Sequence, residues 1–267
     1  MRHVTSETGQ TNITRIASEF VTARRNATAL VEYPGTMPAA LAEAYAMQDA
    51  AIALTDKPIA GWKVGRINPP FEGADRLAGP IFADQTFDEG DTPRAMPVFA
   101  GGFAAAEAEF LLRIGTAPDP AKPDYTLAEA TALIDRVCVG IEIASSPFGG
   151  INDHGAGVTI SDFGNNNGLV IGADVSDWRD IDVNAWPVEL TIDGVTTGVA
   201  TAATMLDGPF GAARFLFELM AARGIALSAG QWISTGAVSG VHPVAIGAKV
   251  VAIFDNRLQV ACSISAQ

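Results

Sequence analysis

Apolar residues recur at helical spacing in the first part of the chain. In the stretches 13–21 and 37–56 they return every three or four positions, which is the period of an amphipathic helix. Pro58 follows the second stretch and ends it, because proline does not continue a helix. Residues 1–10 are polar, and we expect them to fray. The pattern therefore predicts an N-terminal helical region over residues 1–58.

From Ile59 onward, short apolar runs alternate with turn residues, as expected for strands. Strands, two inserted helices and a helical cap predict an α+β domain over residues 59–267. Its core would be a mixed β-roll or sandwich and not a chain of βαβ units. The expected elements are a strand at Ala60–Gly65, helices at Leu127–Arg136 and Pro209–Arg223, and two hairpins that turn at Asp193-Gly194 and Asp255-Asn256.

Three acidic residues stand out against this apolar background. Glu107 and Glu109 are two residues apart, and Glu142 is flanked by Ile141 and Ile143. Residues two apart on a strand point to the same face, so Glu107 and Glu109 would present two carboxylates side by side. Such a cluster is costly in apolar surroundings. A divalent cation that takes oxygen ligands, Mg²⁺ or Mn²⁺, would neutralise it.

The same residues allow a second interpretation. Residues 104–112 are rich in Ala, Glu and Leu, so propensity alone favours a helix. On a helix, Glu107 and Glu109 would diverge and belong to a solvated face. Glu142 could likewise face water from an edge strand. Spacing alone leaves both interpretations open.

Composition and charge narrow the class of protein. A chain of 267 residues suits one large or two small domains, and it holds no apolar run near the roughly eighteen residues that cross a membrane. The net charge of -13 argues against binding of nucleic acid, which uses basic patches. The first residues lack the apolar core of a secretory signal, so we expect a cytoplasmic protein. Cys138 and Cys262 lie in apolar runs and are expected to be buried free thiols.

Several short motifs occur in an order that resembles one family. In chain order they are Gly61-Trp62-Lys63-Val64-Gly65, Gly79-Pro80-Ile81-Phe82, Glu107-Ala108-Glu109-Phe110, Gly140-Ile141-Glu142-Ile143-Ala144, Asp162 before Gly168-Leu169-Val170-Ile171-Gly172, and Ser234-Thr235-Gly236. This order resembles the 2-keto-4-pentenoate hydratase and 4-oxalocrotonate decarboxylase group of the fumarylacetoacetate hydrolase superfamily. No single motif is specific, but the six in order span nearly the whole chain.

The resemblance implies a β-roll catalytic core and an acid triplet that binds Mg²⁺ or Mn²⁺. The matching positions are Glu107, Glu109 and Glu142. The resemblance therefore favours a strand over a helix for residues 104–112.

Two further positions match the family's site. Lys63 matches the active-site lysine, and burial beside Trp62 would lower its pKa and suit it to proton transfer. Without the resemblance, a surface lysine whose stem covers Trp62 is the better interpretation. Thr235 lies in a turn that family members place at the substrate pocket, and a plain β-turn is the alternative.

The chain departs from the family in two segments. Related hydratases carry Asp-Ser-Arg where this chain has Ser145-Ser146-Pro147-Phe148, so the arginine is missing. The segment Asp162-Phe163-Gly164-Asn165 keeps the acid and loses its usual neighbour. We therefore expect short monocarboxylic or apolar-tailed substrates to be preferred over diacids. His154, in a glycine-rich stretch, is interpreted as an exposed loop residue rather than a mobile pocket residue.

The function that the resemblance implies is a metal-dependent hydratase for a small-molecule 2-keto acid. It would add water to a 2-hydroxy-2,4-dienoate to give a 4-hydroxy-2-keto acid, with Lys63 and Asp162 as acid/base candidates and Thr235 at the substrate. A 2-keto acid decarboxylase or an acylpyruvate hydrolase on the same site is the alternative. A non-catalytic partner subunit is a third interpretation, and an intact acid triplet with Lys63 argues against it. The resemblance also suggests a homo-oligomer.

Overall fold

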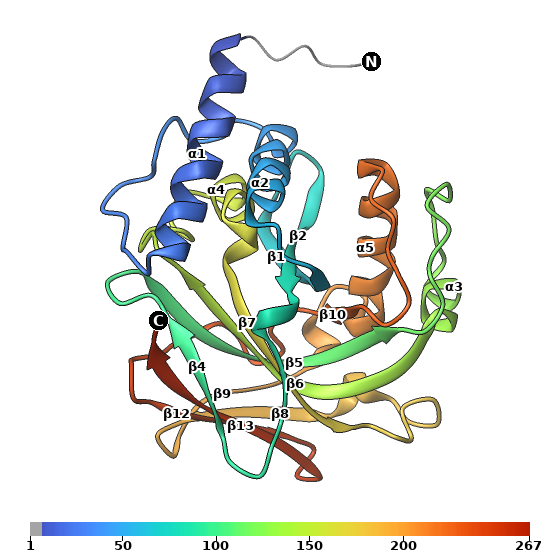
Figure 1. Cartoon of the computed structure of the whole chain (residues 1–267). Coiled ribbons are helices and arrows are strands. Elements are labelled where there is room, and N and C mark those ends of the chain that lie inside the picture. The colour runs from blue at the N-terminus through green and yellow to red at the C-terminus, as the bar shows by residue number, and fades with distance from the viewer. Residues whose placement is uncertain (1–6) are drawn as a thin grey trace.

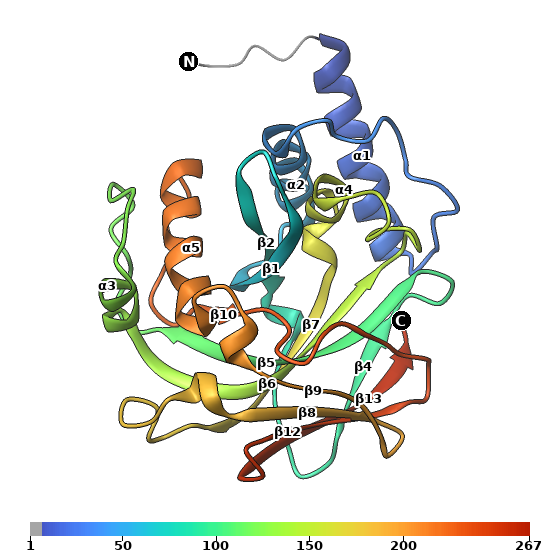
Figure 2. The same cartoon turned by 180° about the vertical axis from the view of Figure 1, so that it is seen from behind.

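Residues 7–267 are described by the computed structural model of this chain, and two β-sheets lie face to face within them (Figures 1 and 2). The larger sheet has the strand order β2-β1-β10-β5-β6-β7-β3, with β11 paired to β5, and the smaller has the order β4-β13-β12-β8-β9. The helices α1, α2, α4 and α5 lie on the side of the larger sheet away from the smaller one (Figure 1). This arrangement confirms the predicted α+β class with a mixed β core.

The elements run along the chain as follows: α1 (Glu7–Arg25), α2 (Leu41–Thr55), β1 (Ile59–Phe71), β2 (Ala74–Phe82), β3 (Thr86–Asp88), β4 (Arg94–Val98), β5 (Phe103–Ile114), α3 (Leu127–Ala132), β6 (Ile134–Ser146), α4 (Ala156–Ser161), β7 (Asn166–Asp174), β8 (Pro187–Ile192), β9 (Val195–Thr201), α5 (Gly208–Arg223), β10 (Trp232–Ser234), β11 (His242–Pro243), β12 (Lys249–Phe254) and β13 (Leu258–Ala266).

The helix α1 buries the apolar side that its sequence pattern predicted. Phe20 is fully buried, and its ring lies edge-on to Tyr33 with 5.7 Å between the centroids. Full burial of one such side chain stabilises the folded state by about 1.5–3 kcal/mol, so the buried face of α1 holds the helix against the rest of the protein. The helix begins at Glu7, so the expectation that residues 7–10 fray is wrong, and residues 1–6 lie outside the described part.

The segment before β1 packs directly against the residues that follow β6. The ring of Tyr33 contacts that of Phe148 at 6.0 Å between centroids, and the backbone N–H of Leu30 donates to the carbonyl oxygen of Pro147 over 2.8 Å. These contacts join the segment before β1 to the end of β6. The division at residues 58 and 59 stays a prediction.

The helix α3 is shorter than its sequence pattern suggested. Thr126 and Glu129 form a capping box that starts it, but it ends at Ala132 and not at Arg136. The reason is tertiary pairing, because β6 begins at Ile134 and Arg136 pairs with Arg113 of β5. Sheet pairing has therefore overridden a weak local preference for helix.

The predicted strand Ala60–Gly65 is part of the longer β1 (Ile59–Phe71), and the predicted helix Pro209–Arg223 corresponds to α5. The hairpin β8–β9 turns at Asp193-Gly194, and β12–β13 turns at Asp255-Asn256. Cys138 and Cys262 are buried free thiols. Among residues 7–267, no helix has both the length and the apolar character that crossing a bilayer requires.

Candidate active site

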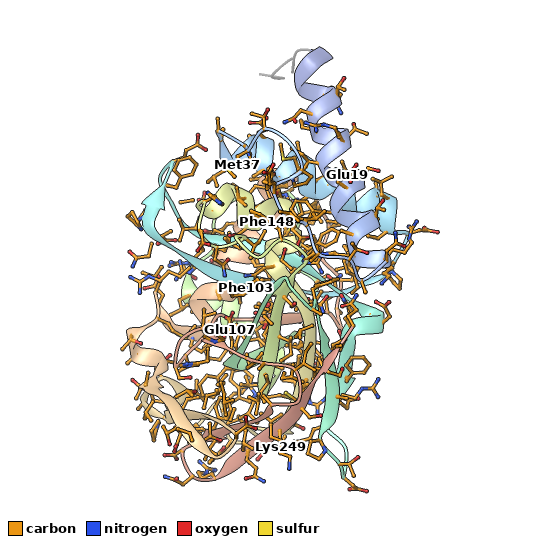
Figure 3. All side chains as sticks on the ribbon, turned by 90° about the vertical axis from the view of Figure 1, so that its left-hand side faces the viewer. Glu19, Met37, Phe103, Glu107, Phe148 and Lys249 are labelled. Carbon is orange, nitrogen blue, oxygen red and sulfur yellow. The ribbon has the colours of Figure 1, made fainter. Side chains whose placement is uncertain are left out.

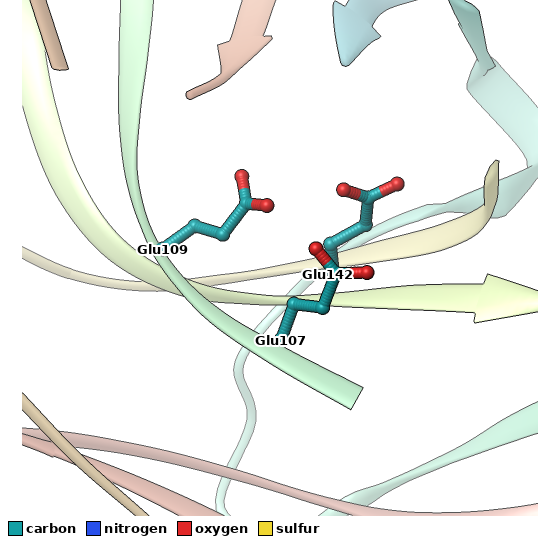
Figure 4. A group of neighbouring side chains, drawn as sticks. All are labelled: Glu107, Glu109 and Glu142. Carbon is teal, nitrogen blue, oxygen red and sulfur yellow. The ribbon is translucent and has the colours of Figure 1, made fainter. Parts of the chain in front are cut away.

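Glu107 and Glu109 lie on β5, near the middle of the larger sheet, and their side chains leave the strand on the same side (Figure 4). Ala108 and Phe110 point the other way and are fully buried in the core. The helix interpretation of residues 104–112 is therefore wrong. Residues 104–112 form a strand, and the alternation of side chains along it places both carboxylates on one face.

Glu142 completes the group from the neighbouring strand. It lies opposite Glu107 in the antiparallel register of β5 and β6. One carboxylate oxygen from each of the three acids lies within 4.8 Å of the others. Glu109 and Glu142 are fully buried, and Glu107 is 4% exposed. Like charges directly opposite each other weaken a sheet, so this arrangement carries a cost that local packing does not explain.

Hydrogen bonds in the described structure satisfy one oxygen of Glu109 and one of Glu142. Glu109 Oε2 accepts from the hydroxyl of Ser234 and, over 3.0 Å, from the N–H of Gly236. Glu142 Oε1 accepts from Asn166 Nδ2 over 2.8 Å. Within residues 7–267, Glu109 Oε1 and Glu142 Oε2 are buried without a hydrogen-bond partner. An oxygen-rich group with buried, unsatisfied lone pairs fits a hard divalent cation.

Electrostatics supports the same conclusion. Burial raises the pKa of Glu107, and burial together with the charges of Glu142 and Glu107 raises the pKa of Glu109 well above its ordinary value. Ionised carboxylates at these positions therefore need positive charge nearby. Lys63 supplies part of it.

Lys63 lies on β1, beside the acids. Its Nζ is 3.4 Å from Glu142 Oε1 and donates to Asn165 Oδ1 over 3.2 Å. Burial by itself lowers the pKa of Lys63, but the charges of Glu142, Glu107 and Glu109 outweigh burial and raise it. The predicted lowering is wrong, because that prediction considered burial without the neighbouring acids. An ammonium group has three N–H donors, so one remains available for a bound ligand.

Asp162 occupies a different position from the one its predicted role requires. Its carboxylate is fully buried and receives two charge-assisted hydrogen bonds from Arg24 of α1, over 2.5 Å to Oδ1 and 2.9 Å to Oδ2. The guanidinium of Arg24 lies between the rings of Phe99 and Phe163, 5.4 and 5.2 Å from their centroids. The carboxylate is directed at Arg24 and does not line the main cavity, so an acid/base role for Asp162 stays a prediction.

The turn after Asp162 carries two residues that contact the site. Phe163, Gly164 and Asn165 have φ values of 56°, 63° and 60°, a left-handed conformation that costs energy at non-glycine positions. Asn165 accepts from Lys63, and Asn166 donates to Glu142. Sequence reasoning missed both asparagines. The run of three asparagines at 165–167 was the available signal.

Thr235 lines the cavity beside the acids. It is buried, and its hydroxyl donates to the carbonyl oxygen of Phe110 over 2.8 Å. That bond fixes the turn in which Gly236 donates to Glu109. The hydroxyl oxygen keeps lone pairs that can accept from a ligand.

The cavity itself has a volume of about 980 Å³. Its walls come from β1 and β2, the segment 235–243, the segment before α5, and the segment 152–159. Lys63, Glu107 and Thr235 line it together, so the structure brings these three predicted residues to one space. His154 is exposed, stacks on Phe148 at 6.0 Å and does not line this cavity, as the loop interpretation expected.

The segment that departs from the family pattern has a packing role. Ser145 is buried, donates to the carbonyl oxygen of Phe103 over 2.6 Å and accepts from the N–H of Phe99. Pro147 and Phe148 hold the N-terminal segment, as described above. Pro147 and Phe148 therefore pack against the N-terminal segment that contains Leu30 and Tyr33.

No family model and no curated protein sequence matches this chain. Solved structures do match. The 4-oxalocrotonate decarboxylase from Pseudomonas putida G7, complexed with magnesium and adipate, superposes with a TM-score of 0.80 at 18% identity, over 99% of this chain and 100% of that one. The same enzyme complexed with calcium and acetate gives a TM-score of 0.79 at 19% identity over the same shares. The chain has the fold of the fumarylacetoacetate hydrolase superfamily.

A third solved structure matches the fold of this chain with a lower TM-score. Fumarylpyruvate hydrolase from Pseudomonas aeruginosa, in complex with Mn²⁺ and pyruvate, matches with a TM-score of 0.60 at 15% identity over 79% of this chain and 91% of that one. The resemblance inferred from six short motifs is therefore confirmed at the level of the fold.

Proposed function

We propose that this chain is a divalent-cation-dependent enzyme that acts on the enol form of a 2-keto acid, and that it hydrates a 2-hydroxy-2,4-dienoate. The observation that carries the proposal is the buried triplet Glu107, Glu109 and Glu142, in which Glu107 lines the cavity and the other two acids each have an unsatisfied carboxylate oxygen. Mg²⁺ or Mn²⁺ is the proposed cation, because structures with the same fold hold magnesium, calcium or manganese. Such a cation would supply positive charge that stabilises a developing enolate oxygen.

The other residues of the site have roles that follow from their contacts. Lys63 Nζ lies 3.4 Å from Glu142 Oε1 and lines the cavity, so its free N–H suits binding of the substrate's C1 carboxylate or donation of a proton to a substrate carbon. Asn165 fixes the direction of that ammonium group. Thr235 and the buried walls on either side would orient the substrate chain and limit access of water to one end of it.

Hydration needs no reactant other than water. A proton moves from the enol oxygen to the far carbon of the diene, which leaves a double bond conjugated to the ketone. Water then adds its O–H across that bond, and the product is a 4-hydroxy-2-keto acid. Lys63 Nζ is the proposed proton carrier, because it is the titratable cation nearest to the acids that also lines the cavity.

Decarboxylation is the second candidate. Two superpositions that cover 99% of this chain are with a 4-oxalocrotonate decarboxylase, and the same enolate would form on that route. A homo-oligomer also stays a prediction, which size-exclusion chromatography with light scattering tests directly.

The test combines metal binding with product analysis. Calorimetric titration with Mg²⁺ or Mn²⁺ should lose its binding heat in Glu107→Gln, Glu109→Gln and Glu142→Gln, while Glu19→Gln, an exposed control on α1 (Figure 3), should bind as the parent does. Dienoates and oxalo-diacids should then be assayed for hydration, decarboxylation and C–C hydrolysis, with and without a chelator. Unchanged affinity in all three site variants would place the cation elsewhere, and absence of every activity would refute the enzyme proposal.

A further inference from the structure

The charge of the cavity wall differs from the charge of the whole chain. The chain carries 30 acidic and 17 basic residues, with a net charge of -13. Among residues 7–267, however, the charged residues that line the main cavity are Lys63, Arg66, Arg76 and Glu107. Glu107 belongs to the acid triplet, so the remainder of the wall is cationic. Such a wall attracts an anionic ligand.

Arg66 and Arg76 form a like-charged pair on neighbouring strands. They lie opposite each other in the antiparallel register of β1 and β2. Directly opposed like charges destabilise a sheet, and the destabilisation is relieved when an anion lies between them. Arg76 has structural partners in Asp75, Leu206 and Phe215, so the member of the pair whose position needs an explanation is Arg66.

The two arginines differ in how far they are already engaged. Arg76 is 8% exposed, with its guanidinium 3.3 Å from Asp75 Oδ1 and bonded to the carbonyl oxygen of Leu206. Arg66 is exposed, and within the described residues its side chain has no hydrogen bond, ion pair or ring contact. Arg66 is thus free to bind a ligand, and Arg76 reinforces the positive charge beside it.

Arg66 is placed to reach the far end of a substrate whose first carboxylate is at Lys63. The two residues are three positions apart on β1, which is about 10 Å along a strand. An odd spacing sends their side chains to opposite sides of the strand. Both nevertheless line the cavity, and the pairing of β1 with β10 ends at Lys63, before Arg66 is reached.

We propose that Arg66, supported by Arg76, is a specificity-determining residue that binds a second carboxylate at the far end of the 2-keto acid substrate. This inference rests on the proposed function for the identity of the reacting end. It reverses the expectation from sequence that diacids would be disfavoured. That expectation considered only the arginine missing near Ser146, whereas β1 brings a different arginine to the cavity.

The test measures binding and turnover separately. Calorimetry in the presence of Mg²⁺ compares adipate with hexanoate, which has the same carbon chain and one carboxylate. The parent protein should bind adipate at least about tenfold more tightly, the scale of one charge-assisted pair in a partly solvated site. Arg66→Gln should remove that preference and leave hexanoate affinity within about twofold, and Arg66→Lys should keep part of it. The preference should also weaken as salt is added.

A matched control removes one positive charge at a distance. Lys249 is exposed on β12 of the smaller sheet, well below Glu107 in the view of Figure 3, and Lys249→Gln should leave the adipate preference unchanged. For a 2-hydroxydienoate with and without a terminal carboxylate, Arg66→Gln should raise KM for the diacid about tenfold and leave kcat/KM for the monoacid unchanged.

The outcomes separate this inference from the proposed function. Equal affinity for adipate and hexanoate in the parent protein, or an adipate preference that survives Arg66→Gln, overturns the role of Arg66 even if keto acids are turned over. An adipate preference that depends on Arg66, with no turnover of any keto acid, supports the role of Arg66 and refutes the proposed function.

Discussion

The ion pair between Arg24 and Asp162 gives the sharpest prediction about stability. The Arg24 side chain is 10% exposed and that of Asp162 is fully buried, so Arg24→Met leaves a carboxylate without its cation in a dry environment. Removal of one partner from a buried pair costs about 3–5 kcal/mol. With a urea m-value of about 3 kcal/mol/M, the unfolding midpoint should fall by between about 1 and 2 M. Fluorescence-detected urea unfolding measures this change.

A double-mutant cycle isolates the pair from the packing around it. Asp162→Asn keeps the shape of the side chain and removes the counter-charge of Arg24, so it should also destabilise by several kcal/mol, on the order of the first variant. The double variant should lose less than the sum of the two, with a coupling energy of about 0.5–3 kcal/mol. Additive losses would show that the two side chains act independently.

The same variants test the acid/base role predicted for Asp162. If Asp162 positions the turn that carries Asn165 and Asn166, Arg24→Met and Asp162→Asn should lose stability together and lose turnover together. A general acid or base would behave differently. An Asp162→Asn variant with parental stability and turnover reduced by about 10² or more would refute the positioning argument and support catalysis by Asp162.

The remaining predictions each follow from a single feature. Lys63→Met should lower turnover by about 10² or more in steady-state assays while metal affinity by calorimetry stays near that of the parent protein, and near-normal turnover would return Lys63 to a structural role. Burial raises the pKa of Cys138 and Cys262 to about 12, so at pH 8 both thiols should resist iodoacetamide in the folded protein and react in denaturant. Because these folded-state pKa values are raised, their contribution to stability should be present below the unfolded thiol pKa of about 8.5 and decline as the pH rises above it. Gly79→Ala would place a Cβ 2.1 Å from the carbonyl oxygen of Phe163, so it should cost about 1–3 kcal/mol in urea unfolding; a cost near zero would show that the turn yields easily.

Local pattern was sufficient for much of the fold. The turns at Asp193-Gly194 and Asp255-Asn256 were identifiable because turn residues there separate two apolar runs. The face shared by Glu107 and Glu109 followed from strand alternation once the segment was taken as a strand. That choice was not available from propensity, because residues 104–112 favour a helix locally and become a strand through pairing with β6 and β10.

Contacts between distant residues could not be read from the sequence. Arg24 and Asp162 are 138 positions apart, and neither the spacing nor the composition of α1 marks Arg24 as a buried cation. The direction of the Lys63 pKa was wrong for the same reason, since it depends on acids that lie 44 or more positions away in the chain. The position of Arg66 in the cavity wall is likewise defined only by the three-dimensional fold.

The acid triplet and the cavity wall lie in parts of the molecule that differ in their tolerance to substitutions and insertions. Glu107, Glu109 and Glu142 lie on β5 and β6, which are interior strands of the larger sheet, whereas much of the wall comes from the end of the β1–β2 hairpin and the segment 235–243. Insertions and substitutions accumulate more readily in such peripheral segments than in interior strands. Changes in the wall can therefore alter which ligand the cavity accepts, while the strands that hold the acids stay the same.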